Sequence, residues 1–134
     1  ALLEDFSVIN EKNELKKFIF KNGIDVYEYL FKLSGDLVIV YEFSKFRYLS
    51  KKYLLEEIYK QREPIFPEDL NITRDELIES GVANNETVDE LMLMIAEHLI
   101  NNPNKNRKEI LLKTAEQISK NKIFKIFRNV KWIK

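Results

Sequence analysis

TRDELIESGVANNETVDELMLMIAEHLINNP, which runs from Thr73 to Pro103, contains the signals that begin and end two helices. Two capping-box patterns occur in it, Thr73 with Glu76 and Thr87 with Glu90. In such a box the threonine and glutamate side chains each bond the other residue's backbone N–H at a helix start. The stretch therefore predicts a short helix that ends at Gly81 and a longer one that ends at the asparagines before Pro103.

The spacing of apolar residues supports helices on both sides of this stretch. The longer helix has an apolar face formed by Val88, Leu91, Met92, Ile95 and Leu99. Downstream, a further amphipathic helix is expected over Arg107 to Ser119, through Ile110, Leu111, Thr114 and Ile118. The basic end from Lys122 is expected to add a last helical turn or two. The second half of the chain therefore reads as helices joined by short loops.

The first half gives the same pattern of helices. Asn10 is expected to cap a helix that ends at Gly23 and buries Leu15, Phe18 and Ile19. A second helix, ending near Gly35, is expected to bury Ile24, Tyr27, Leu30 and Phe31. Leu37 to Phe43 is β-branched, but a lone short strand cannot satisfy its backbone, so a buried helix is expected.

The rest of this half holds one more predicted helix and a loop. Ser50 is expected to cap a helix over Lys51 to Gln61, and a loop follows from Pro64 to Pro67. Glycine and proline number three each, so few residues break helices. The fold class is therefore all-α, a compact array of about six to seven short helices in a single domain over residues 1–134.

Composition excludes several classes of protein. Apolar residues make up 45% and charged residues 33%, which is typical of a chain that folds in water. Cysteine is absent, so disulfides and thiolate zinc sites are excluded. No apolar run approaches the roughly 18 residues of a membrane span, and the start of the chain is acidic. We expect a cytoplasmic protein without a membrane partner.

The net charge of zero hides a polarised distribution. From Glu63 to Leu99, Arg74 is the single base among many acids. From Ile100 to Lys134, only Glu109 and Glu116 oppose a run of lysines and arginines. The end of the chain is therefore strongly basic.

No catalytic or metal site is expected. His98 is the only histidine, and no carboxylate lies three or four residues before it, so helical metal-ligand pairs do not form. A serine nucleophile needs a histidine base, of which the chain has only one, and neither a G-x-S-x-G elbow nor a glycine-rich phosphate loop is present. Acidic pairs such as Asp75 with Glu76 point apart on a helix and are read as solvated charge.

Basic residues give the best candidates for binding. Cations at the start of a helix are unfavourable to its dipole, and a phosphate partner would explain them. The candidates for contacts with phosphate are Lys105, Arg107, Lys108, Lys120, Lys122 and Arg128. Second choices are Arg47 and Lys51, which are near Tyr48 and Tyr53 in a cluster of bases. A solvated cationic surface remains an alternative for each of them.

PIFPEDLNITRDELIESGVANNETVDELMLMIAEHLIN, Pro64 to Asn101, resembles the helical C-terminal region of bacterial tRNA nucleotidyltransferases and their poly(A) polymerase relatives. In that family a P-x-F-P turn precedes a short helix that ends in glycine, and then a long helix that ends in asparagines. The matching residues here are Pro64, Phe66, Pro67, Glu76, Leu77, Gly81, Val88 and Leu91. The family's Gly-Pro loop is replaced by Asn84 to Asp89.

The resemblance implies a function in tRNA processing. Residues 1–62 would correspond to the family's helical body and 63–134 to its tail, which hold tRNA by shape and phosphate contacts. The family's catalytic motifs have no match in this chain. Mg²⁺ and nucleotide would then belong to a separate catalytic head, and this chain would hold no cofactor of its own.

Two other functions fit the same sequence. One is a helical protein interaction or assembly module, in which the acidic middle and the basic end pair across subunits. In it, Phe124, Phe127, Trp132 and Ile133 would bury against the partner. The other is a membrane-surface anchor formed by the basic amphipathic end. The sequence does not fix the oligomeric state.

Overall fold

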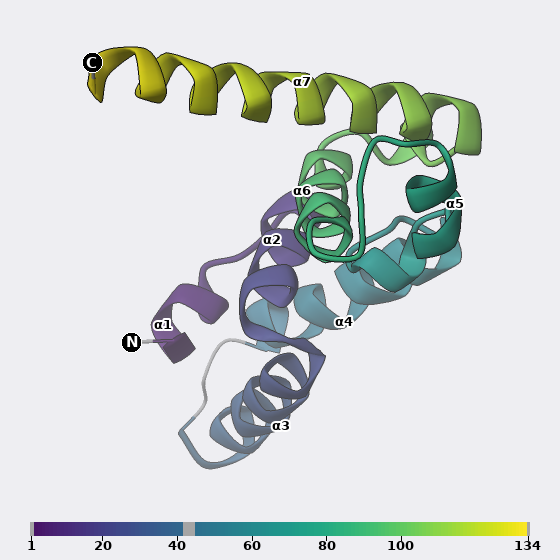
Figure 1. Ribbon diagram of the computed structural model, residues 1–134. Helices are drawn as coiled ribbons and strands as arrows, with labels where there is room; N and C mark the ends of the chain where they lie inside the picture. Colours follow the sequence, from purple (N-terminus) through teal and green to yellow (C-terminus); the bar gives the residue numbers. More distant parts are fainter. Residues whose placement is uncertain (1, 42–44, 134) are drawn as a thin grey trace. The chain divides into compact units, whose positions relative to one another are not determined.

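Helices form all the regular structure in the described chain, as the all-α prediction requires. The computed structural model describes residues 2–41 and 45–133, and the side chains of 38–41, 45–46 and 122–133 are outside its description. Within these ranges the elements are α1 (Leu2–Ser7), α2 (Lys12–Asn22), α3 (Ile24–Tyr41), α4 (Lys45–Lys60), η1 (Pro67–Asp69), α5 (Arg74–Glu79), α6 (Val88–Ile100), η2 (Pro103–Lys105) and α7 (Lys108–Ile133). Figure 1 shows them in chain order.

The chain divides into two compact units. Unit 1 is Ala1–Ile65 and holds α1 to α4, and unit 2 is Phe66–Lys134 and holds α5 to α7 with the two 3₁₀ turns. Each unit has its own buried apolar residues.

Aromatic packing forms the core of unit 1. Phe6 of α1 is fully buried, and its ring lies 5.6 Å from Phe18 and 5.7 Å from Tyr27. Leu15, Phe18 and Ile19 of α2 are buried as predicted. The helix that carries them begins at Lys12 after Glu11, rather than at the predicted cap Asn10, and neither residue supplies a side-chain cap bond that the structure records.

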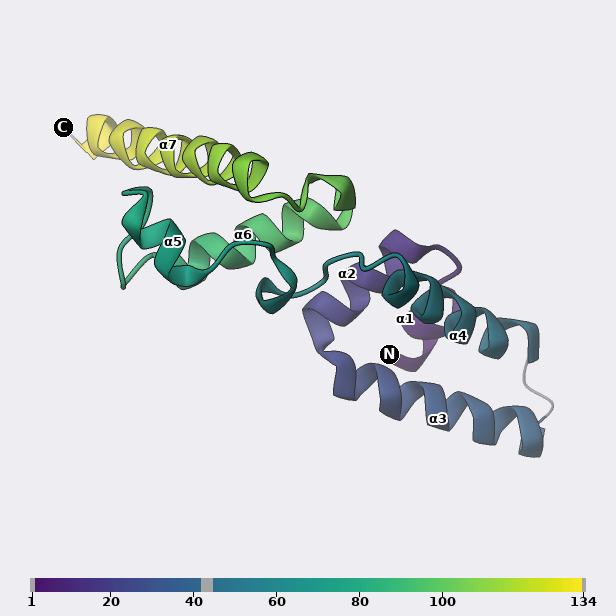
Figure 2. The ribbon, with the colours of Figure 1, turned by 90° about the vertical axis from the view of Figure 1, so that its right-hand side faces the viewer.

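Gly35 does not end a helix, which corrects the sequence prediction. α3 continues through it to Tyr41, so part of Leu37 to Phe43 belongs to the same helix. A Cβ at Gly35 would lie 3.1 Å from the ring of Tyr48 on α4. The glycine therefore allows two helices to approach closely, which Figure 2 shows as α3 beside α4.

Ser50 does not begin a helix either. It lies inside α4, which begins at Lys45, and its hydroxyl donates to the Arg47 carbonyl at 2.8 Å. Serine and threonine often bond the backbone within a helix in this way. A cap residue and a residue in mid-helix therefore look alike in the sequence.

One of the two predicted capping boxes forms in unit 2. Thr73 accepts from the Glu76 N–H at 3.1 Å, and Glu76 accepts from the Thr73 N–H at 3.0 Å. Thr87 makes no side-chain cap bond. Instead, Asn84 Oδ1 accepts from the Glu86 and Thr87 N–H groups and orders the turn before α6. This asparagine turn replaces the second predicted box.

The core of unit 2 lies between α6 and α7. Val88, Leu91, Ile95 and Leu99 on α6 are buried, and so are Leu111 and Ala115 on α7. α6 has 13 residues and α7 has 26, so at 1.5 Å per residue α7 is about 20 Å longer. The helix predicted for Arg107 to Ser119 and the turns predicted from Lys122 are therefore one helix that continues beyond α6 (Figure 1).

Candidate nucleic-acid interface

Asn106 fixes the corner between η2 and α7, where the first predicted cations lie. Its Oδ1 accepts from the Asn71 N–H at 2.8 Å, and its Nδ2 donates to the Asp69 carbonyl at 3.0 Å. The Asn71 side chain in turn donates to the Asn106 carbonyl at 2.8 Å. Two asparagines that are far apart in sequence therefore hold the corner against the segment that leads into α5.

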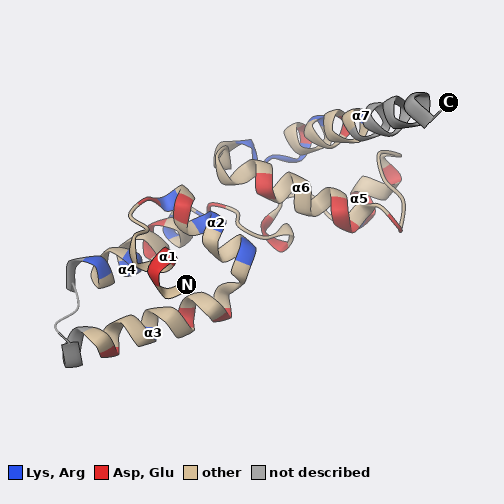
Figure 3. Cartoon of the chain, turned by 90° about the vertical axis from the view of Figure 1, so that its left-hand side faces the viewer, with Lys and Arg blue, Asp and Glu red and all other residues tan. Residues whose placement is uncertain are grey.

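Lys105 and Arg107 project from this corner. Lys105 is half-buried and Arg107 is exposed. Within the part of the chain that the structure describes, neither side chain makes a hydrogen bond or an ion pair. Figure 3 shows basic residues at this corner and acidic residues on α5 and α6. These two cations are available to an external anion.

Lys108 already has a partner. Its ammonium forms an ion pair with the carboxylate of Glu76, the residue that completes the capping box of α5. The hydrogen bond from Lys108 holds the pKa of Glu76 below its usual value, and that of Lys108 is raised by the same contact. A cation at the start of α7 is unfavourable to the helix dipole, and the ion pair with Glu76 within unit 2 explains the presence of Lys108 there.

The exposed face of α7 alternates in charge over its first turns. Glu109, Lys113, Glu116 and Lys120 are all exposed at helical spacing. Each lysine follows a glutamate by four residues, an arrangement that favours local pairing and leaves little net charge. After Glu116 no acid follows, and the bases are Lys120, Lys122, Lys125, Arg128, Lys131 and Lys134. We call residues 120–134 the acid-free segment.

Three predicted contacts lie on this segment. Lys120 is exposed, and among the described residues it has no hydrogen-bond or ion-pair partner. The side chains of Lys122 and Arg128 are outside the described residues, although their backbone is part of α7. The end of α7 therefore carries positive charge that no neighbouring acid in the sequence compensates.

The two second-choice residues belong to unit 1. Arg47 is exposed on α4. Lys51 is 2% exposed, and its ammonium donates to the Ser7 carbonyl at 2.9 Å and lies 5.6 Å from the centre of the Phe6 ring. Burial lowers the pKa of Lys51, and the nearby Arg47 lowers it further. Lys51 cannot reach an RNA backbone while unit 1 stays folded.

A buried ion network in unit 1 was not predicted from the sequence. Glu63 accepts from Lys16 at 2.8 Å and from Lys12 at 2.7 Å. The side chain of Lys16 is fully buried and that of Glu63 is 6% exposed. Burial would raise the pKa of Glu63, but the two lysines outweigh it and hold the pKa below its usual value. This network joins α2 to the segment that follows α4.

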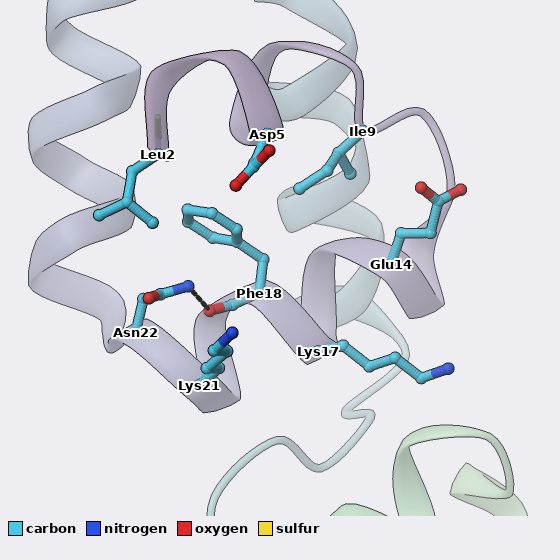
Figure 4. A pocket seen from close by; sticks show the side chains of 8 residues that line it. All are labelled: Leu2, Asp5, Ile9, Glu14, Lys17, Phe18, Lys21 and Asn22. Atoms are coloured by element: carbon cyan, nitrogen blue, oxygen red, sulfur yellow. Dashed lines mark hydrogen bonds between the residues drawn. The ribbon is translucent and has the colours of Figure 1, made fainter.

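A shallow hollow of about 320 Å³ lies between α1 and α2. Figure 4 shows Leu2, Ile9 and Phe18 in it, with the charged side chains around them. Its lining includes two carboxylates and two ammonium groups, those of Asp5, Glu14, Lys17 and Lys21. Because the two signs balance, the hollow offers no net attraction to phosphate.

The described residues contain no group of three or more histidine, aspartate or glutamate side chains placed to hold a metal ion. Within the same residues no helix is both long enough and apolar enough to span a membrane. In comparisons with family models, curated proteins and solved structures, nothing matches this chain.

Proposed function

We propose that the chain is a helical RNA-binding module that holds its RNA through the sugar-phosphate backbone. The observation that carries the proposal is the distribution of cations in unit 2. Lys105, Arg107 and Lys120 have no partner among the described residues, and the acid-free segment continues their positive charge along a helix. Contacts between such cations and phosphates supply most of the affinity of non-specific nucleic-acid binding.

Transfer RNA is the class of RNA that the sequence resemblance favours. A cationic helix can follow the phosphates of a folded RNA without reading bases, which suits recognition by shape. Residues 120–133 of the acid-free segment measure about 20 Å along the helix. In this proposal any nucleotide-transfer chemistry belongs to a separate catalytic head, and this chain positions the RNA.

The proposal is tested by titrating labelled tRNA with the purified chain, and in parallel a duplex RNA of equal length, at several salt concentrations. The test variant is Lys105→Gln/Arg107→Gln. Its matched control, Lys17→Gln/Lys21→Gln, removes two exposed cations from unit 1, which also have no partner among the described residues. A third variant, Lys122→Gln/Arg128→Gln, tests the acid-free segment.

We expect the chain to bind tRNA more tightly than the duplex, with a steep dependence on salt. Each lost phosphate contact makes the plot of log affinity against log salt shallower by about 0.7 to 0.9. The test variant loses two cations, so its slope should be shallower than that of the wild type by a little under 2. The control should retain the wild-type slope. Absence of tRNA binding at low salt, or an equal loss in the control, would contradict the proposal.

A further inference from the structure

The exposed face of α6 carries a short apolar stripe between two acids. Leu93 is 48% exposed and Met94 is 39% exposed, while Glu90 and Glu97 are exposed beside them. These four residues follow the i, i+3, i+4, i+7 spacing, so they share one face of the helix. We call them the α6 stripe. α6 thus has apolar residues on two faces, and those on the face opposite the stripe, among them Leu91, Ile95 and Leu99, are buried.

The charge around the stripe limits what can cover it. Asp89 and Glu86 are exposed at the start of α6, near Glu90, and Arg74 is the base that pairs with Asp89, at 3.0 Å. A partner must therefore present apolar groups flanked by positive charge. RNA, which is anionic, would be repelled by this face.

The acid-free segment has the matching composition. It contains six bases and no acid, and apolar residues recur in it at helical intervals, namely Ile123, Phe127, Val130 and Ile133. Residues 120–133 of it belong to α7, so they are already helical. A basic amphipathic helix of this kind is complementary in both charge and polarity to the α6 stripe.

The stripe and the segment of one molecule cannot meet while α7 is intact. α7 packs against α6, and Leu111 and Ala115 of its first turns are buried, as is the face of α6 opposite the stripe; α7 then continues without a break to Ile133. To reach the opposite face of α6, the helix would have to break and fold back. The segment must therefore come from another molecule.

We infer that the α6 stripe is a docking surface for the acid-free segment of a second copy of this chain. Two half-exposed apolar side chains bury little area, so the association belongs to the weak, transient class. Because opposite charges contribute, it should be strongest at low salt. If the acid-free segment also binds RNA, as the proposed function holds, then RNA and the second copy compete for it.

The test measures self-association of the full chain by sedimentation velocity over a range of concentrations at low salt. In parallel, a labelled peptide with the sequence of residues 120–134 is titrated with the full chain. The test variant is Leu93→Gln/Met94→Gln, and both positions are exposed, so the fold should persist, as far-UV circular dichroism can verify. The control, Tyr53→Gln, removes an aromatic side chain that is 66% exposed on α4.

We expect the wild-type chain and the control to self-associate and to bind the peptide. The test variant should sediment as a monomer and bind the peptide at least tenfold more weakly. Absence of peptide binding to the wild-type chain, or equal binding to the folded test variant, would overturn the inference. Adding tRNA separates the two proposals: if tRNA does not bind but the stripe variant still loses self-association, only the proposed function fails.

Discussion

At the scale of single residues, two buried lysines have different kinds of partner. Lys16 faces the carboxylate of Glu63, whereas Lys51 donates to backbone carbonyl groups. A buried ammonium is costly unless a partner compensates it. We therefore expect the stability of unit 1 to depend on Glu63 far more than on an exposed glutamate.

Glu63→Gln should destabilise unit 1 by about 3 kcal/mol at pH 7, because it leaves the buried ammonium of Lys16 without its carboxylate. Urea unfolding measures this, with near-UV circular dichroism of tyrosine as the signal. All six tyrosines lie in unit 1 and the single tryptophan, Trp132, lies in unit 2, so the two signals separate the units. The exposed control Glu28→Gln should change stability by about 0.5 kcal/mol or less.

The same pair predicts a dependence on pH. The pKa of Glu63 is lower in the folded chain than its ordinary value of 4.5. Its stabilising contribution is therefore complete above about pH 4.5 and is lost as the pH falls through the lowered pKa. The stability difference between wild type and Glu63→Gln should shrink below that range. A difference that stays constant down to pH 2 would contradict the assigned role.

Burial of Lys16 and Lys51 could not be predicted from the sequence. Both lie among other lysines on amphipathic helices, where such residues are usually solvated. Glu63 reaches Lys16 because Arg62, two residues after the end of α4, has a left-handed conformation with φ 54°. The Arg62 N–H donates to the Tyr59 carbonyl and the Glu63 N–H to the Ile58 carbonyl. Glycine is the usual residue at this position, and its absence removed the local signal.

At the scale of elements, the contact of Gly35 with Tyr48 decides how α3 and α4 pack. In an open helix Gly35→Ala would stabilise by about 1 kcal/mol. Here the new Cβ would lie 3.1 Å from the Tyr48 ring, which is stacked on Phe31 with its centroid 4.6 Å away. We expect the substitution to destabilise unit 1 by about 1 kcal/mol, because the stacked ring cannot move away freely.

A double-mutant cycle tests this explanation. In a Tyr48→Ala background the ring is gone, so Gly35→Ala should become stabilising by about 0.5 to 1 kcal/mol. Urea unfolding of the four proteins gives the coupling energy, again with tyrosine signals from unit 1. If Gly35→Ala has the same sign in both backgrounds, the glycine is not required by Tyr48.

The helices differ in how well local patterns predicted their ends. The Thr73 box was predicted correctly because both of its bonds are local. The helix end predicted at Gly35 was wrong because this glycine allows close packing of two helices. The helix start predicted at Ser50 was wrong because this serine bonds the backbone inside a helix. Only contacts between elements distinguish these roles, and a single sequence does not show them.

At the scale of the whole molecule, the charge asymmetry was visible in the sequence, but the pairing within it was not. The contact between Glu76 and Lys108 joins residues far apart in the chain, as do the bonds between Asn71 and Asn106. No local pattern indicated that Lys108 would have a carboxylate partner or that Lys105 and Arg107 would lack one. The composition of the sequence therefore located the candidate interface, and the structure showed which of its cations already have a carboxylate partner.

The ion pair between Glu76 and Lys108 predicts a substitution that tightens RNA binding instead of weakening it, and this prediction rests on the proposed function. Glu76→Gln keeps an acceptor for the capping box but removes the negative charge beside Lys108. The freed ammonium can then contact a phosphate, so tRNA should bind several-fold more tightly at low salt. The fall of log affinity with log salt should become steeper by up to about 0.9.

The control is Glu68→Gln, which removes an exposed carboxylate of η1 that has no ion-pair partner among the described residues. Both variants change the net charge equally, so a general electrostatic effect would tighten both alike. A gain restricted to Glu76→Gln would mean that Glu76 shields Lys108 from RNA in the wild-type chain. Equal gains would remove Lys108 from the interface and leave Lys105, Arg107 and the acid-free segment as its contacts.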